Sequence, residues 1–326
     1  MYAQKAYYPS GGIPLCAHKE RWGGDGMSRR SLALVAVVVL VALGIGYLLL
    51  SPGLSPQAPR AGGLKIVVTF YSLKGDIEYL LCQGDEVIPV TPQGVDPHEY
   101  QLTPSDVARI REGSLIVSTA HAPFEQKIKQ LVETGELKSR LIEIPRIPGI
   151  KLLVNPSTGT LNYHWPIYDP NNYIAYINYT AHVMASLRPE CASTYLSKAS
   201  GLIANITSIE RSAPRLNLVA VGSSPVVQYS VEWMGINVSY LLIKEADLPA
   251  TPQDIATIED AMARGAINVV VISKGLETTS AGKTLVDLAS KYGKPVLYVP
   301  SPISSESTYE KILVVVKEVE KVLQKG

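Results

Sequence analysis

Short apolar runs alternate with longer stretches of mixed polarity from residue 64 to the C-terminus. The apolar runs predict strands at 64–70, 86–90, 114–119, 140–144, 216–222, 238–243, 267–273 and 295–299. The intervening patterns predict helices at 75–82, 104–113, 124–134, 226–234, 252–264, 281–292 and 307–324. Such alternation builds parallel sheets covered by helices on both faces. We therefore predict an α/β protein with two similar lobes and a ligand cleft between them.

The middle of the chain separates the two halves of this pattern. Residues 145–170 are irregular and rich in Pro and Gly, and helical patterns follow at 172–187 and, after Pro189, at 190–211. We expect an N-terminal lobe at 64–170, a linking helix region at 171–212 and a C-terminal lobe at 213–326.

The N-terminus has a different character. Residues 32–50 form an uncharged apolar run of 19 residues, about the length that spans a hydrocarbon core, and Arg29 and Arg30 precede it. By the positive-inside rule, residues 1–31 stay in the cytoplasm and the remainder is exported. A transmembrane anchor and a signal peptide are both consistent with this run, and its length favours the anchor. Met27 would itself make a normal start, with 1–26 as an extension, and 51–63 reads as a tether.

Composition narrows the function classes. The chain has 326 residues, enough for two domains, and its net charge of +1 gives no reason to expect a nucleic-acid partner. Cys82 and Cys191 are the cysteines beyond the apolar run. They can pair in an oxidising compartment only by joining distant parts of the chain, and neither has metal-site spacing.

The stretch 94–106, Gly-Val-Asp-Pro-His-Glu-Tyr-Gln-Leu-Thr-Pro-Ser-Asp, holds an imidazole in a stiff loop. Pro97 fixes its own φ and pushes the preceding residue toward an extended conformation. A helix then begins with Thr103 as cap and Asp106 completing a capping box. A stiff polar loop of this kind suits a pre-formed metal site, with His98 as its ligand.

This stretch resembles the first-ligand motif of the cluster A-I (ZnuA/TroA-like) metal-binding proteins of zinc and manganese ABC transporters. The resemblance extends from about residue 64 to the C-terminus, more weakly after 210. It implies two lobes joined by a rigid long helix, Zn²⁺ or Mn²⁺ as the transported ligand, and an ABC transporter permease as partner. From the apolar run at 32–50 we expect a cell-membrane protein with a single N-terminal span and its ectodomain outside the cell.

Three histidines form the predicted metal site. His98 has the motif above, and His164, in His-Trp-Pro-Ile-Tyr-Asp-Pro, resembles the second ligand of the family. His121 is included from its position alone, just after a predicted strand. Imidazole suits zinc, and three histidines in a tetrahedron leave one position for a carboxylate or water. His18 lies before the apolar run, and His182 is interpreted as structural.

The second lobe departs from the family pattern. The resemblance implies a third histidine and a carboxylate there, but Ser224 and Lys274 fall at those positions. Glu245, Asp247 and Glu277 are alternative sources of a carboxylate, and the sequence does not choose among them.

Three functions therefore remain open. The preferred one is an extracytoplasmic solute-binding protein that captures zinc, or next manganese, for an ABC importer. The cleft could instead bind a metal chelate or organic solute through Tyr163, Trp165 and the histidines. The third is a membrane-tethered zinc enzyme, since an open zinc position activates water. We expect no enzyme, because no acid–base motif, P-loop or Gly-x-Ser-x-Gly elbow accompanies the histidines.

Overall fold

The computed structural model describes residues 62–245 and 248–324, which belong to one compact unit, 62–326. The anchor expected at 32–50 and nearly all of the tether at 51–63 lie outside the described residues. Within the described ranges, no helix combines the length and apolar character that a membrane crossing requires.

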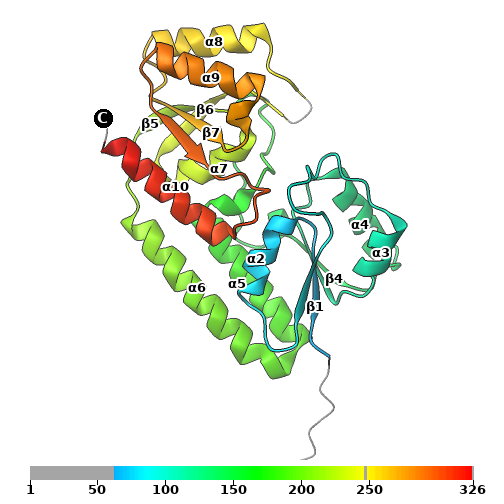
Figure 1. The fold of residues 1–326 in the computed structure, drawn as a ribbon. Coiled ribbons are helices and arrows are strands. Elements are labelled where there is room, and N and C mark those ends of the chain that lie inside the picture. The colour runs from blue at the N-terminus through cyan, green and yellow to red at the C-terminus, as the bar shows by residue number, and fades with distance from the viewer. Residues whose placement is uncertain (1–61, 246–247, 325–326) are drawn as a thin grey trace, which may run out of the picture. The chain divides into compact units, whose positions relative to one another are not determined.

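The first lobe is built on a four-stranded parallel sheet in the order β2-β1-β3-β4 (Figure 1). Its strands are β1 (Lys65–Val68), β2 (Glu86–Pro89), β3 (Leu115–Ser118) and β4 (Arg140–Glu143). Its helices are α2 (Lys74–Glu78), α3 (Pro104–Ile110) and α4 (Pro123–Glu133), with 3-10 turns η1 (Tyr71–Leu73), η2 (Ile144–Arg146) and η3 (Pro166–Tyr168). Strand β3 is buried along its whole length, as expected for a central strand covered on both faces.

The second lobe repeats this topology with the order β6-β5-β7-β8. Its strands are β5 (Leu218–Gly222), β6 (Ile236–Leu241), β7 (Val269–Ser273) and β8 (Val296–Val299). Its helices are α7 (Gln228–Val231), α8 (Pro252–Ala263), α9 (Ser280–Lys291) and α10 (Thr308–Leu323), with 3-10 turns η5 (Pro225–Val227), η6 (Glu232–Met234) and η7 (Leu276–Thr278). The prediction of two similar parallel-sheet lobes is therefore confirmed.

The helix predicted at 226–234 in the second lobe is not a regular α-helix. Residues 226–234 form two 3-10 turns around the single turn of α7, because Val231 leaves helical geometry (φ −126°). Valine is β-branched, which lowers its helix propensity. Gly235, at φ 81°, then leads into β6.

Two helices connect the lobes. Helix α5 (Pro170–Leu187) packs along α6 (Ala192–Ser212), with the short turn η4 (Pro189–Cys191) between them (Figure 1). Tyr173, Tyr176 and Tyr195 of this pair are buried in the same apolar cluster as the first sheet, and Tyr229 of α7 joins that cluster. The connection is thus a packed helical hairpin rather than one continuous rod.

A polar contact ties the end of the chain to the first lobe. Asp76 of α2 is fully buried and accepts hydrogen bonds from the amide and hydroxyl of Thr308 at 2.8 Å, and from the Tyr173 hydroxyl at 3.0 Å. The carboxylate therefore lies at the N-terminus of α10, where the helix dipole favours negative charge. Helices from both lobes and the connection meet at this one side chain.

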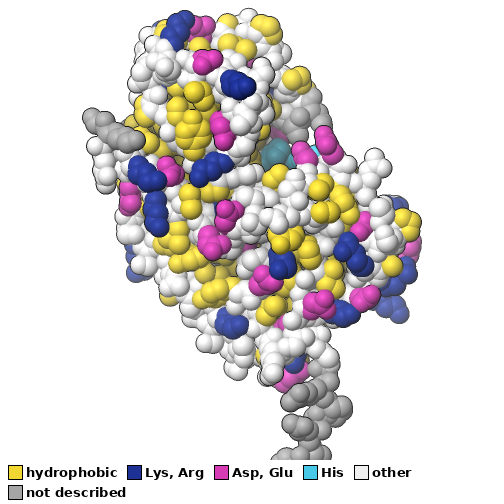
Figure 2. All heavy atoms as spheres, viewed as in Figure 1, with side chains coloured by type: hydrophobic (Ala, Val, Ile, Leu, Met, Phe, Trp, Pro, Cys, Tyr) yellow, Lys and Arg dark blue, Asp and Glu magenta, His cyan; other side chains and the backbone are white. Residues whose placement is uncertain are grey.

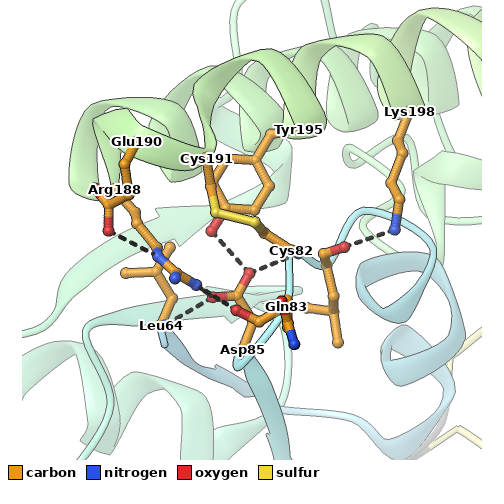
Figure 3. The surroundings of a disulfide bond; sticks show 10 residues. Leu64, Cys82, Gln83, Asp85, Arg188, Glu190, Cys191, Tyr195 and Lys198 are labelled. Atoms are coloured by element: carbon orange, nitrogen blue, oxygen red, sulfur yellow. Dashed lines mark hydrogen bonds and ion pairs between the residues drawn. A yellow bond between two sulfur atoms is a disulfide. The ribbon is translucent and has the colours of Figure 1, made fainter. Parts of the chain in front are cut away.

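A disulfide joins the first lobe to the helical hairpin (Figure 3). Cys82 follows α2 and Cys191 ends η4, 109 residues later. Beside the bridge, the buried Asp85 carboxylate accepts from the Cys82 amide at 2.8 Å, the Tyr195 hydroxyl at 2.7 Å and the Arg188 guanidinium at 2.7 Å. The pairing that the sequence left open is present in the structure, supported by a satisfied buried charge.

Replacing both bridge cysteines (Cys82→Ala with Cys191→Ala) should lower the free energy of unfolding by about 2–5 kcal/mol, because the unfolded chain regains the entropy of a long open loop. Guanidinium unfolding of the purified full chain measures this, and dithiothreitol should reproduce the loss in the unmodified protein but change nothing further in the variant. Under denaturing, non-reducing conditions, thiol titration should find one free thiol, Cys16. Three free thiols would rule the disulfide out.

Candidate metal centre

His98 lies in the loop that follows β2, held as the sequence predicts. Its amide donates to Asp96 Oδ1 at 2.9 Å, and the chain then enters α3 through the predicted capping box of Thr103 and Asp106. The Tyr100 hydroxyl donates to the same Asp106 carboxylate at 2.8 Å. Both ends of the loop are fixed by local hydrogen bonds, and the half-buried imidazole lies between them.

His121 follows β3 and is positioned by the buried carboxylate of Glu125. This carboxylate accepts six hydrogen bonds of 2.6–2.9 Å, from the hydroxyls of Thr69, Ser118 and Thr119 and the amides of Thr119, His121 and Ala122. Ala120 adopts a left-handed conformation (φ 56°) just before the histidine. Such conformations cost free energy and persist only where the surroundings enforce them.

His164 lies in the irregular segment before η3, and Asn162 holds it. The Asn162 side-chain nitrogen donates to Pro225 O and Gln228 Oε1, both at 2.9 Å, so its oxygen faces the histidine. That oxygen accepts from the His164 amide and from Nδ1, at 2.9 and 3.0 Å. Neutral His164 therefore carries its proton on Nδ1 and presents the lone pair of Nε2. The next residue, Trp165, is also left-handed (φ 55°).

The structure brings the three predicted histidines together. One nitrogen of each of His98, His121 and His164 lies within 4.8 Å of the others, and the Nε2 atoms of His121 and His164 are 3.0 Å apart. Since His164 Nε2 is an acceptor, His121 Nε2 donates the hydrogen between them. Three lone pairs can converge on this point when neutral His121 carries its proton on Nδ1 instead, because its Nε2 is then free to bind a cation.

Electrostatics favour the neutral, ligating form of two of these rings. Burial, together with the nearby His121 and His98, lowers the pKa of His164 to about 3. Burial and the charge of His98 also lower the pKa of His121, against a smaller opposing effect of Glu125. Imidazole binds metal through its unprotonated nitrogen, so these rings need lose no proton to do so at neutral pH.

A second-lobe carboxylate lies beside the cluster. Glu245 Oε2, in the loop after β6, is 3.6 Å from His164 Nε2, and its other oxygen accepts from Asn155 Nδ2 at 3.0 Å. Asn155 also donates to the Lys244 carbonyl at 2.9 Å, so its side-chain amide fixes the position of the loop that carries Glu245.

The other proposed carboxylates are placed differently. The Glu277 carboxylate accepts from the Gly275 amide and closes its own turn, while Asp247 lies outside the described residues. His182 is exposed on α5, where its Nδ1 donates to the Asn178 carbonyl at 2.8 Å.

A cavity of about 410 Å³ opens between the histidines and the second lobe. Figure 2 shows histidine side chains within the hollow between the two lobes. Tyr163 stacks on His121 with ring centroids 6.3 Å apart, and Phe70 packs behind Trp165 at 5.9 Å. Ser224 and Lys274 line the opposite wall.

Sequence reasoning missed three residues that position the site: Glu125 and Asn162, which hold histidines, and Asn155, which holds Glu245. Glu125 and Asn162 leave local signals: an acidic residue at the third position of α4, and an amide two residues before His164. Asn155 leaves no such signal, because its partners are about 90 residues away.

Comparisons with known proteins agree with this architecture. The family model described as "zinc-uptake complex component A periplasmic" (ZnuA) matches residues 66–319. The manganese-binding lipoprotein MntA of Halalkalibacterium halodurans is 22% identical over 79% of this chain and 86% of its own. The iron-binding protein YfeA of Yersinia pestis is 23% identical over 82% and 88%, respectively. The solute-binding protein FpvC of Pseudomonas aeruginosa, solved with Mn²⁺, has the same fold, with a TM-score of 0.67 at 17% identity over 81% of this chain and 99% of FpvC.

The lowered pKa of His164 makes the metal-free fold sensitive to acid. Unfolding returns this imidazole to its ordinary pKa of about 6.5, so the unfolded state binds the extra proton between pH 6.5 and 3, and stability falls as pH drops through that window. Between pH 7 and 5, the unmodified protein should lose about 2 kcal/mol more than His164→Gln. Urea unfolding of both proteins in the presence of a chelator measures the difference, and equal losses would contradict the assignment.

Proposed function

Because the chain belongs to the family of zinc-uptake complex component A proteins, whose members are solute-binding proteins, we propose that it captures a divalent metal ion outside the cytoplasm for an ABC importer. The observation that carries the proposal is the convergence of one nitrogen from each of His98, His121 and His164 within 4.8 Å.

Zinc is the proposed cargo, with manganese next. Three neutral imidazoles and one carboxylate are a donor set that tetrahedral zinc accepts. Glu245 is the proposed fourth ligand, since its oxygen lies 3.6 Å from His164 and needs only a small shift to reach an ion between the rings. The names of the relatives, which include manganese- and iron-binding proteins, support a divalent metal in general.

The residues that hold the three histidine loops would raise the affinity of the site for its ion. The amide of His98 is held by Asp96, that of His121 by Glu125 and that of His164 by Asn162. Partners behind the ligands fix ring orientation and typically contribute about 10–100-fold to metal affinity.

The remaining parts of the chain fit this proposal. Residues 32–50 would anchor the protein in the cell membrane and 51–63 would tether it, with 1–31 on the cytoplasmic side. The lobes at 64–170 and 213–326, joined by 171–212, would present the loaded cleft to the permease. The proposal includes no nucleic acid.

The first test is zinc binding by the purified full chain. Isothermal titration should detect one site, and His98→Ala should weaken it by more than about 100-fold, because a lost ligand costs more than a lost supporting residue. His182→Ala, which changes an exposed histidine on α5, serves as the matched control and should bind as the unmodified protein does. Equal binding by both variants, or none by the unmodified protein at neutral pH, would refute the proposal.

The role of Glu245 has its own test. Glu245→Gln keeps the side-chain shape and the contact with Asn155 but removes the charge, so zinc affinity should fall roughly 10–100-fold. Glu277→Gln neutralises another second-lobe carboxylate and should leave affinity unchanged. If the two variants behave alike, the fourth ligand is not Glu245.

A further inference from the structure

Charge is poorly balanced across the cleft for a bare dication. Three neutral imidazoles contribute no negative charge, and the carboxylates of Glu245 and Asp96, which lie at the cleft, contribute one each. The opposite wall carries Lys274, whose ammonium forms no ion pair with any described residue. A dication bound here is balanced by these two carboxylates, so the cleft keeps the one positive charge of Lys274, an arrangement that a partly apolar cleft disfavours.

The size of the cavity also favours a ligand larger than a bare metal ion. Its 410 Å³ exceeds by far the space that a metal ion fills between its ligands, and it lies in the range of small-molecule sites. Phe70, Tyr163 and Trp165 line the first-lobe side, while Val226, Ile243 and Leu276 line the second. Apolar walls with a few convergent polar groups are typical of sites for organic ligands.

The second-lobe wall also offers the polar groups that an organic anion needs. Lys274 follows directly on β7, and Ser224 follows β5 just before η5, so both lie beyond the carboxyl ends of parallel strands. The charge of Lys274 is one of the effects that lower the pKa of Glu306, but no ion pair forms between the two side chains. The ammonium is exposed and able to meet an anion in the cleft.

We propose that the cleft takes the metal together with a small organic polycarboxylate: the three histidines and Glu245 hold the ion, one carboxylate of the co-ligand takes a fifth coordination position, and Lys274 binds its far carboxylate. This inference rests on the proposed function and narrows its substrate class to a metal chelate. The co-ligand supplies the missing negative charge and occupies the volume that the ion leaves. Its carboxylate and the Lys274 ammonium form a charge-assisted contact that connects the lobes through the ligand.

The experiment measures retention of radiolabelled citrate, the probe polycarboxylate, by the full chain in equilibrium dialysis with and without equimolar zinc. One citrate per protein should be retained only when zinc is present, and zinc content should be one per protein. Lys274→Gln should weaken citrate retention roughly 10–100-fold while leaving zinc content unchanged, since a charged contact is lost but no metal ligand is. Lys283→Gln, an exposed lysine of α9 away from the cleft, is the matched control and should behave as the unmodified protein does.

The outcomes separate this inference from the proposed function. Zinc retained from the zinc–citrate mixture with no citrate bound, or citrate retained equally by Lys274→Gln, would overturn the chelate while leaving metal capture intact. Loss of zinc by the unmodified protein would overturn metal capture itself. Citrate retained equally with and without zinc, and with no zinc bound, would overturn both, because the cleft would then be an organic-anion site.

Discussion

The candidate metal centre depends on one buried carboxylate that hydrogen-bonds no imidazole ring. Glu125 accepts hydrogen bonds from the ends of β1 and β3 and from the first turn of its own helix, so it fixes where both strands stop and where α4 begins. The amide of His121 is one of its donors, which makes the position of that imidazole a consequence of the same network. A buried acceptor of this kind strongly disfavours any arrangement that leaves its donors unpaired.

The features that could be predicted from the sequence depend on residues that are close together in the chain. The strands appear as apolar runs, and the His98 loop is recognisable because its proline and its capping box act on neighbouring residues. Glu245 could be named only as one of three carboxylates, since its approach to His164 is set by Asn155, far away in the chain. The disulfide was open for the same reason: 109 residues separate its cysteines, and only the packing of the helical hairpin against the first lobe brings them together. Departures from ideal elements, such as the broken helix around α7, follow from single residues whose effect depends on tertiary context.

The two lobes share a topology but not a role. Every imidazole of the cluster belongs to the first lobe or to the segment that leads out of it, whereas the second lobe contributes Glu245, Lys274 and much of the apolar wall. Asp76 joins the first lobe to α10, and the tyrosines of the helical hairpin pack into one continuous core with the first sheet. Since these contacts cross the connection between the lobes, large rigid-body opening would disrupt buried polar and apolar packing together. Small displacements of the loops around the cleft would disturb far less of this buried packing.

This asymmetry has a consequence for how fast cargo can leave. Separating the lobes would remove the contacts with Glu245 and Lys274, and an ion would remain on three nitrogens whose loops are held by Asp96, Glu125 and Asn162. Dissociation would then be governed by the exchange of imidazoles one at a time for water or for an incoming donor, rather than by mechanical opening. A permease that receives ions from this protein would therefore have to act as a chemical competitor, offering ligands of its own before the first lobe releases what it holds.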